Sequence, residues 1–215
     1  MRIFLDTANI DDIRRGAAMG VVDGITTNPT LVAKEGVEYR DRVLEICEVV
    51  DGPISAECVS SEADALIEEA RRIASWHPNV VVKIPLNEAG LQAIRAVSAE
   101  GIKVNTTLIF SANQALLAAK AGAAYVSPFI GRLNDVGHDG MEVVRETVAI
   151  FDQYNLPTQV LAASVRGARD VTEAALAGAH VATLPPAALF QMIQHPLTDK
   201  GIEIFLRDAE RYTAV

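Results

Sequence analysis

Short apolar runs alternate with amphipathic stretches along the whole chain. The apolar runs that resemble buried strands lie at residues 3–7, 24–27, 54–59, 80–84, 104–110, 125–130, 159–164 and 181–184. Strands that are apolar on both faces and separated by helices are typical of parallel pairing, because helices then cover each face of the sheet. Eight such units in a chain of 215 residues predict an α/β fold, a single-domain (β/α)8 (TIM) barrel covering residues 1–215.

An open, doubly wound sheet is the alternative arrangement of the same elements. Such a sheet usually carries a glycine-rich GxGxxG turn after its first strand. The corresponding segment here, Asp6-Thr-Ala-Asn-Ile10, has no glycine. The closed barrel is therefore the favoured prediction.

Several residues have the chemistry of helix ends. Ser61 and Asp64 resemble a capping box at the start of one amphipathic stretch. Gly101 follows a second stretch and is expected to end its helix. Ser111 is expected to cap the start of a third helix, which Gly122 would end.

Two further helical stretches follow the last apolar run, at residues 187–194 and 197–212. The second stretch places four apolar residues on one face, namely Ile202, Phe205, Leu206 and Ala209. This extra C-terminal helix can either close the end of its own barrel or pack on a neighbouring subunit, and the pattern alone fits both arrangements.

The composition limits the classes of partner. Half of the residues are apolar, and no run approaches the ~18 uninterrupted apolar residues of a membrane helix. The start, MRIFLDTAN, reaches Asp6 too early for a signal peptide, so we expect a cytoplasmic protein with free, buried thiols at Cys47 and Cys58. A net charge of -9 argues against a nucleic-acid or anionic membrane surface, so an anionic ligand needs a local site.

Lys83 stands out because it interrupts the apolar run Val80-Val-Val-Lys-Ile-Pro85. One interpretation is structural: the stem of the lysine covers apolar surface and its ammonium group reaches water. The other is chemical: a lysine in an apolar site can react as a neutral amine. Free lysine has a pKa of about 10.4 and is neutral in under ~0.1% of molecules at pH 7, so amine chemistry requires desolvation.

Polar residues recur where the apolar runs end, and in a barrel these ends meet at one mouth. They are Asp6, Thr26, Asn28, Glu57, Lys83, Asn105, Thr107, Arg132, Ser164 and Arg166. Taken singly, each has a structural explanation, such as a helix cap for Asp6 or an ion-pair partner for Glu57. Together, one amine with two carboxylates and several hydroxyl and amide groups forms a general acid/base array.

An amine in such an array can attack a carbonyl group and form an iminium ion, which accepts the electrons of a neighbouring C–C bond. The reaction needs a base for a hydroxyl proton and an acid/base group for the loss of water. Asp6 and Glu57 fit these two requirements.

A second group of residues suits an anion. Ser164 and Arg166 follow the seventh apolar run and open a helix, and Arg132 follows the sixth. Guanidinium groups, a hydroxyl and helix-start amides suit a phosphate, and Gly167 beside Arg166 would permit close approach. Pairing of these arginines with surface carboxylates is the alternative.

Metal chemistry finds little support in the sequence. The four histidines, at positions 77, 138, 180 and 195, show neither HxH nor HExxH spacing. We therefore expect neither a zinc-dependent aldolase nor a nucleophilic triad.

The strand-end segments resemble the transaldolase family from Met1 to the C-terminal helix. The segments that carry the resemblance are Phe4-Leu-Asp-Thr-Ala-Asn9, Gly24-Ile-Thr-Thr-Asn-Pro-Thr30, Val82-Lys-Ile-Pro85, Val104-Asn-Thr-Thr-Leu-Ile-Phe-Ser111, Ser127-Pro-Phe-Ile-Gly-Arg132 and Ala163-Ser-Val-Arg166. They are most similar to the short-chain subfamily that also includes the fructose-6-phosphate aldolases. Short members are commonly rings of five subunits, often stacked as ten through a C-terminal helix. The resemblance therefore implies a homo-oligomer, a pentamer or a decamer, in which residues 197–212 pack on a neighbour.

The resemblance implies a role for each matching residue. Lys83 would form the Schiff base, Asp6 would be the base for C–C cleavage, and Glu57 and Thr107 would hold the water of imine formation and hydrolysis. Two further groups would bind substrate: Thr26, Asn28 and Asn105 the dihydroxyacetone portion, and Arg132, Ser164 and Arg166 the phosphate.

Glu57 and Phe129 discriminate between the two activities of the family, because the aldolase branch typically has glutamine and tyrosine there. They imply a class I transaldolase of the pentose phosphate pathway, with no metal or organic cofactor. It would move a dihydroxyacetone unit from sedoheptulose 7-phosphate or fructose 6-phosphate to glyceraldehyde 3-phosphate or erythrose 4-phosphate. The alternatives are a fructose-6-phosphate aldolase that releases free dihydroxyacetone, and a catalytically silent sugar-phosphate-binding scaffold.

Overall fold

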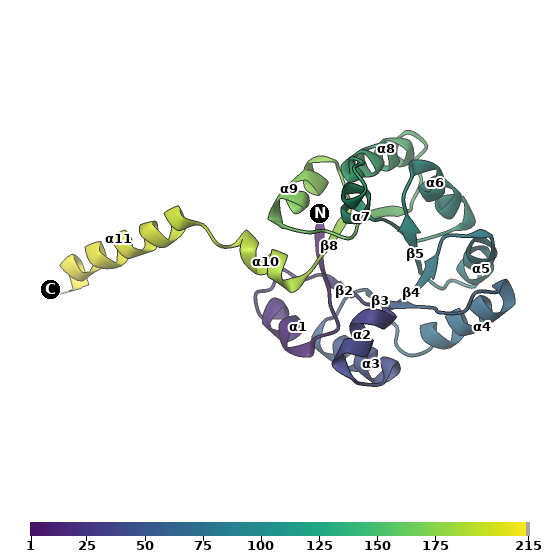
Figure 1. The fold of residues 1–215 in the computed structure, drawn as a ribbon. Coiled ribbons are helices and arrows are strands. Elements are labelled where there is room, and N and C mark those ends of the chain that lie inside the picture. Colours follow the sequence, from purple (N-terminus) through teal and green to yellow (C-terminus); the bar gives the residue numbers. More distant parts are fainter. Residues whose placement is uncertain (214–215) are drawn as a thin grey trace.

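The computed structural model describes residues 1–213, and its eight strands form one closed parallel barrel (Figure 1). Each strand pairs with the next in the chain, and β1 also pairs with β8, which closes the sheet. The strands are β1 (Arg2–Asp6), β2 (Gly24–Thr26), β3 (Ile54–Glu57), β4 (Val80–Pro85), β5 (Val104–Ile109), β6 (Tyr125–Pro128), β7 (Gln159–Ala162) and β8 (Val181–Leu184). The predicted barrel is confirmed and the open sheet was the wrong alternative. Residues 214–215 of the predicted domain lie outside the described residues.

Helices surround the barrel, and one long helix leaves it (Figure 1). Those of the first half are α1 (Ile10–Ala17), α2 (Pro29–Glu35), α3 (Tyr39–Val49), α4 (Ala63–Ala74) and α5 (Glu88–Ala99). Those of the second half are α6 (Ala112–Ala121), α7 (Ile130–Asp135), α8 (Gly140–Gln153), α9 (Ala168–Leu176), α10 (Pro186–Met192) and α11 (Pro196–Thr213). Pairs of helices follow β2 and β6, which the sequence pattern did not separate.

Side chains along each strand point alternately into the barrel and outward, and the inward-pointing ones form the site. A small apolar cluster fills the barrel interior, formed by Phe4, Val81, Tyr125, Leu161, Ala163 and Val181. Side chains two positions apart lie on the same face of a strand. Polar residues follow members of this cluster at that spacing, as Asp6 follows Phe4 and Lys83 follows Val81. The interior therefore consists of an apolar layer with a polar layer next to it, at the carboxyl ends of the strands.

The predicted helix ends had mixed outcomes. Ser111 accepts a hydrogen bond from the Gln114 amide, and Gly122 ends that helix in the left-handed region, as expected. Gly101 is also left-handed and directly follows α5's C-cap residue, Glu100.

The capping box at Ser61 was wrong, because α4 begins at Ala63 with Glu62 as its N-cap residue. The loop before this helix is held instead by Glu69, whose carboxylate accepts from the amides of Val59 and Ser60.

Helix α11 extends away from the barrel (Figure 1), so closure of its own barrel was the wrong alternative. Its large apolar side chains are largely uncovered within the chain, as the 75% exposure of Phe205 and 64% exposure of Leu206 show. No helix in the described range is long and apolar enough to cross a membrane.

Helix α5 approaches β4 closely at Gly90, so a larger side chain there should lower the stability of the fold. A Cβ atom at Gly90 would lie 2.1 Å from the Pro85 carbonyl oxygen, which is backbone and cannot turn aside. Gly90→Ala should therefore lower the free energy of unfolding by about 1–3 kcal/mol in chemical denaturation. Gly201→Ala is the matched control, since a Cβ there meets nothing within 4 Å, and it should stabilise its helix by up to about 1 kcal/mol. Equal stability of Gly90→Ala and the wild type would contradict the close packing.

Candidate active site

Each predicted site residue lines at least one of two neighbouring cavities, and Lys83 lines both. The first, of about 170 Å³, is lined by Asp6, Thr26, Asn28, Lys83, Asn105, Ser127, Phe129, Arg132, Ala163, Ser164, Arg166 and Thr183. The second, of about 460 Å³, is lined by Asn28, Pro29, Thr30, Leu31, Glu57, Lys83, Thr107, Leu108, Phe129 and Arg132. The amine therefore lies where the two cavities meet.

Lys83 is buried inside the barrel, with 5% of its surface exposed. Its Nζ lies 3.0 Å from Glu57 Oε2 and donates to the Thr27 carbonyl at 3.4 Å. Strand register places Glu57 and Asn105 beside it, because each is the direct partner of Lys83 on a neighbouring strand. The ammonium group is thus held among protein groups rather than in bulk water, and the expected ion pair with Glu57 is present.

Asp6 does not cap the helix that follows it, because the N-cap residue of α1 is Asn9. Thr26 donates to Asp6 Oδ1 at 2.7 Å, and the hydroxyls of Thr26 and Thr183 lie 2.6 Å apart. Since the Thr26 hydroxyl has one proton and gives it to Asp6, Thr183 must donate to Thr26. One carboxylate oxygen of Asp6 is therefore oriented by a relay of two hydroxyl groups.

Asn105 is fully buried and fixed from both sides. Its Oδ1 accepts from Ser127 at 2.6 Å, and its Nδ2 donates to Ser55 at 3.2 Å.

Asn28 is the N-cap residue of α2, since its Oδ1 accepts from the Leu31 amide at the start of that helix. It also lines both cavities, so the amide nitrogen can serve a ligand.

Thr107 differs from these residues because its buried hydroxyl has no hydrogen-bond partner among the described residues. It is 1% exposed and lines the second cavity with Glu57 and Lys83. A buried hydroxyl without a partner costs free energy, so the position suits a water molecule or a substrate hydroxyl.

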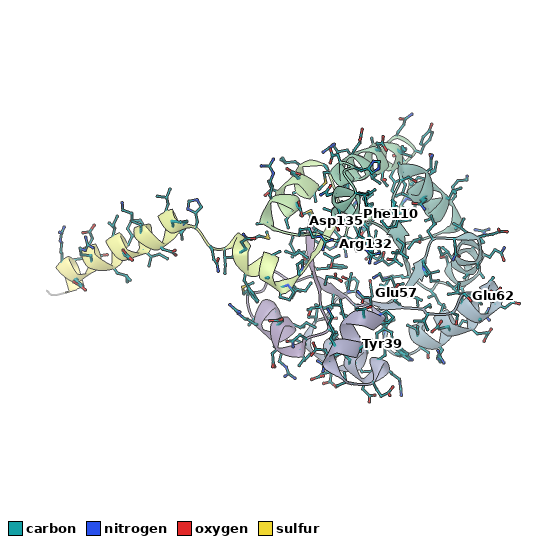
Figure 2. All side chains as sticks on the ribbon, viewed as in Figure 1. Tyr39, Glu57, Glu62, Phe110, Arg132 and Asp135 are labelled. Carbon is teal, nitrogen blue, oxygen red and sulfur yellow. The ribbon has the colours of Figure 1, made fainter. Side chains whose placement is uncertain are left out.

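The anion-binding candidates lie at the mouth, where Figure 2 shows Arg132 on the α7 side of the barrel. The Arg132 guanidinium stacks 5.0 Å from the centre of the Phe129 ring. Arg166 pairs with Asp135 at 2.6 Å, and both side chains are more than half exposed, so the alternative of a surface ion pair holds in this state. Exposed pairs contribute at most about 1 kcal/mol, and a ligand can displace this one.

One detail of the predicted anion site was wrong. The amides of Arg166 and Gly167 are not free, because Asp170 Oδ2 accepts from them at 2.7 and 3.3 Å. The backbone also packs closely beside this site at Gly131, where a Cβ would lie 2.1 Å from the Ser164 carbonyl oxygen.

Sequence reasoning missed the hydroxyl groups that orient the site, in particular Ser55, Ser127 and Thr183. The signal was present for two of them: Ser127 and Thr183 each stand two residues after a member of the apolar interior cluster. It also missed Tyr39, which Figure 2 places on the α2–α3 side of Glu57.

The two cysteines and the possible metal ligands give less support for a catalytic role. Burial raises the pKa of Cys58 to about 12 and that of Cys47 to about 11, so neither thiol is a good nucleophile at neutral pH. Within residues 1–213, no three histidine, cysteine or acidic side chains are grouped so that they could hold a metal ion. The candidate chemistry therefore centres on Lys83 and the two carboxylates.

A lysine and two carboxylates at the mouth of a (β/α)8 barrel supply the amine, acid and base groups that aldolase-type chemistry uses. The profile of the transaldolase/fructose-6-phosphate aldolase family matches residues 3–214. The chain is 60% identical to a probable transaldolase of Herpetosiphon aurantiacus, over 97% of this chain and 94% of that one. It is 58% and 55% identical to probable transaldolases of Heliobacterium modesticaldum and Bacillus cereus, over 98% of each chain. The protein belongs to the transaldolase/fructose-6-phosphate aldolase family.

Proposed function

We propose that this protein is a transaldolase that forms a Schiff base on Lys83. It would transfer a dihydroxyacetone unit from sedoheptulose 7-phosphate or fructose 6-phosphate to glyceraldehyde 3-phosphate or erythrose 4-phosphate. This is a reaction of the cytoplasmic pentose phosphate pathway. The observation that supports the proposal best is the buried amine, 3.0 Å from a carboxylate and open to a cavity that also holds Asp6 and two arginines. The electron sink would be an iminium ion, so the proposed steps require no metal or organic cofactor.

Formation of the Schiff base would use Glu57 as acid and base. The Lys83 ammonium passes a proton to the Glu57 carboxylate, and the neutral amine attacks the ketone carbon of the sugar. Glu57 gives this proton to the former carbonyl oxygen, takes a second proton from the nitrogen, and passes it to the resulting hydroxyl, which leaves as water and gives the iminium ion. The unpaired hydroxyl of Thr107 would hold that water beside the pair. Hydrolysis runs the same steps in reverse.

Cleavage of the C–C bond would use Asp6. Its carboxylate accepts the proton of the substrate hydroxyl next to the bond, the bond's electrons enter the iminium, and an aldehyde leaves. Thr26 occupies Oδ1 of Asp6, so Oδ2 remains for the substrate. The enamine that remains on Lys83 then attacks the acceptor aldehyde, and Asp6 returns the proton.

Binding would divide between the two ends of the sugar. Thr26, Asn28 and Asn105 lie with Lys83 in the first cavity and would bind the hydroxyl groups of the dihydroxyacetone unit. Arg132, Ser164 and Arg166 would bind the phosphate, with Arg166 exchanging the Asp135 carboxylate for it.

Fructose-6-phosphate aldolase activity is the second candidate, because the family includes both activities. Phe129 favours the transferase, since it lines both cavities around Lys83 and has no hydroxyl. A tyrosine there could protonate the enamine and release free dihydroxyacetone, whereas phenylalanine leaves the enamine available to an acceptor aldehyde.

An assay with and without acceptor separates these activities. With fructose 6-phosphate alone, we expect little glyceraldehyde 3-phosphate, and erythrose 4-phosphate should start sustained turnover.

Lys83→Arg should lower kcat by about 10³-fold or more, because it removes the nucleophile but keeps a positive charge beside Glu57. Lys103→Arg is the matched control, since Lys103 lies in a separate surface cavity, and it should leave kcat unchanged.

Sustained cleavage without acceptor would identify an aldolase instead. Binding of fructose 6-phosphate without turnover would identify a silent binding scaffold.

We also propose that α11 packs on a neighbouring copy of this chain in a ring of five or a stack of ten. Its uncovered face, including Ile202, Phe205 and Leu206, is apolar, and the helix stands clear of its own barrel (Figure 1). Exposed apolar surface of this kind is typical of subunit interfaces.

Light scattering coupled to size exclusion tests this arrangement. The wild type should elute at five or ten times the 23.0 kDa of one chain, and Phe205→Asp/Leu206→Asp should shift it to smaller species. Leu176→Asp is the control, because Leu176 is 84% exposed on α9, and it should leave the mass unchanged. A monomeric wild type, or an unchanged mass in the double variant, would contradict the arrangement.

A further inference from the structure

Strands β2 and β3 stop pairing beside the reacting lysine. The Thr27 amide donates to the Ser55 carbonyl at 3.0 Å, as a parallel ladder requires. The next bond of that ladder would run from the Glu57 amide to the Thr27 carbonyl. Instead, the Thr27 carbonyl accepts from Lys83 Nζ, and the Glu57 amide donates to the Tyr39 hydroxyl at 2.5 Å.

The Tyr39 hydroxyl belongs to a hydrogen-bond chain with one direction. The Thr27 hydroxyl donates to the Ser55 carbonyl at 2.8 Å, so its only proton is used. Tyr39 must therefore be the donor in the 3.3 Å contact between the Tyr39 and Thr27 hydroxyls. The phenol accepts from β3 and donates toward β2, and it links both strand ends to the start of α3.

Two features keep this phenol in place. Burial raises the pKa of Tyr39 to about 12, so the phenol keeps its proton at neutral pH and can donate to Thr27, although the hydrogen bond from the Glu57 amide favours the ionised form. Its ring packs edge-on against Trp76, with ring centres 5.7 Å apart. Because that contact does not involve the hydroxyl, a phenylalanine at position 39 can keep the ring contact and lose only the hydrogen bonds.

We propose that Tyr39 is a positioning residue for the reacting pair, Glu57 and Lys83. Its hydroxyl accepts the hydrogen bond that the Glu57 amide would otherwise give to the Thr27 carbonyl. The Thr27 carbonyl is therefore free to accept from Lys83, and Glu57 is held where its carboxylate contacts Nζ. Without the hydroxyl, the Glu57 amide loses its partner or returns to the Thr27 carbonyl, and either change displaces the pair. This inference rests on the proposed function, since it assigns Tyr39 a part in the proton transfers of Schiff-base chemistry.

Tyr39→Phe tests the role in the full chain, because it keeps the ring and removes only the hydroxyl. We expect kcat of the acceptor-dependent reaction to fall between about 10- and 100-fold, the scale of misplaced catalytic groups. KM for the ketose phosphate should change less than about twofold, because Tyr39 does not line either cavity and the groups that would bind the sugar are unchanged. Tyr154→Phe is the matched control: it makes the same change at a side chain that is 65% exposed and lines neither cavity of the candidate site, and kcat should stay within about twofold of wild type.

A double-mutant cycle with Glu57→Gln provides a second test. If Tyr39 acts through Glu57, adding Tyr39→Phe to Glu57→Gln should lower kcat little further. Full additivity, or an unchanged kcat in Tyr39→Phe beside an active wild type, would overturn the positioning role alone. An inactive wild type would overturn the proposed function, and the role of Tyr39 with it.

Discussion

The contact between the Lys83 ammonium and the Glu57 carboxylate constrains most of the structure around it. Two charges 3.0 Å apart inside a barrel are stable only together, because removing one partner of a buried pair typically costs about 3–5 kcal/mol. Neighbouring strands hold the two residues in direct register, so the pair exists only where the sheet is correctly aligned. The same closeness that stabilises the charges allows a proton to pass between them, and the proposed chemistry depends on that transfer.

Uncharged groups complete the polar layer, and their hydroxyl protons run in defined directions. Thr183 donates to Thr26, which donates to Asp6, and Ser127 donates to Asn105, which donates to Ser55. Donors and acceptors that are already oriented need little rearrangement when a substrate arrives. Thr107, which lines the second cavity, has a buried hydroxyl without a protein partner among the described residues, and this fits a position left open for water.

Residues whose chemistry conflicts with their surroundings were predictable from the sequence. A lysine among valines and polar residues at the ends of apolar runs led to the barrel mouth and to the polar residues of the predicted site, whereas Phe129 came only from the family resemblance. Residues that act through hydrogen bonds across the fold were not predictable in the same way. The Tyr39 hydroxyl, on α3, accepts from the Glu57 amide on β3. The Glu69 carboxylate, on α4, accepts from the Val59 amide in the loop before that helix, where Ser61 was expected to cap. The position of Asp170, three residues after Gly167, was a visible sign that the amides there were already used.

Borohydride reduction in the presence of fructose 6-phosphate, followed by peptide mapping, tests the central claim most directly. An iminium ion on Lys83 would be reduced to a stable amine, so the peptide that contains Lys83 should gain a dihydroxyacetone-derived mass. The other four lysines, at positions 34, 103, 120 and 200, should remain unmodified. The absence of any adduct, or an adduct on one of those four, would contradict Schiff-base catalysis by Lys83.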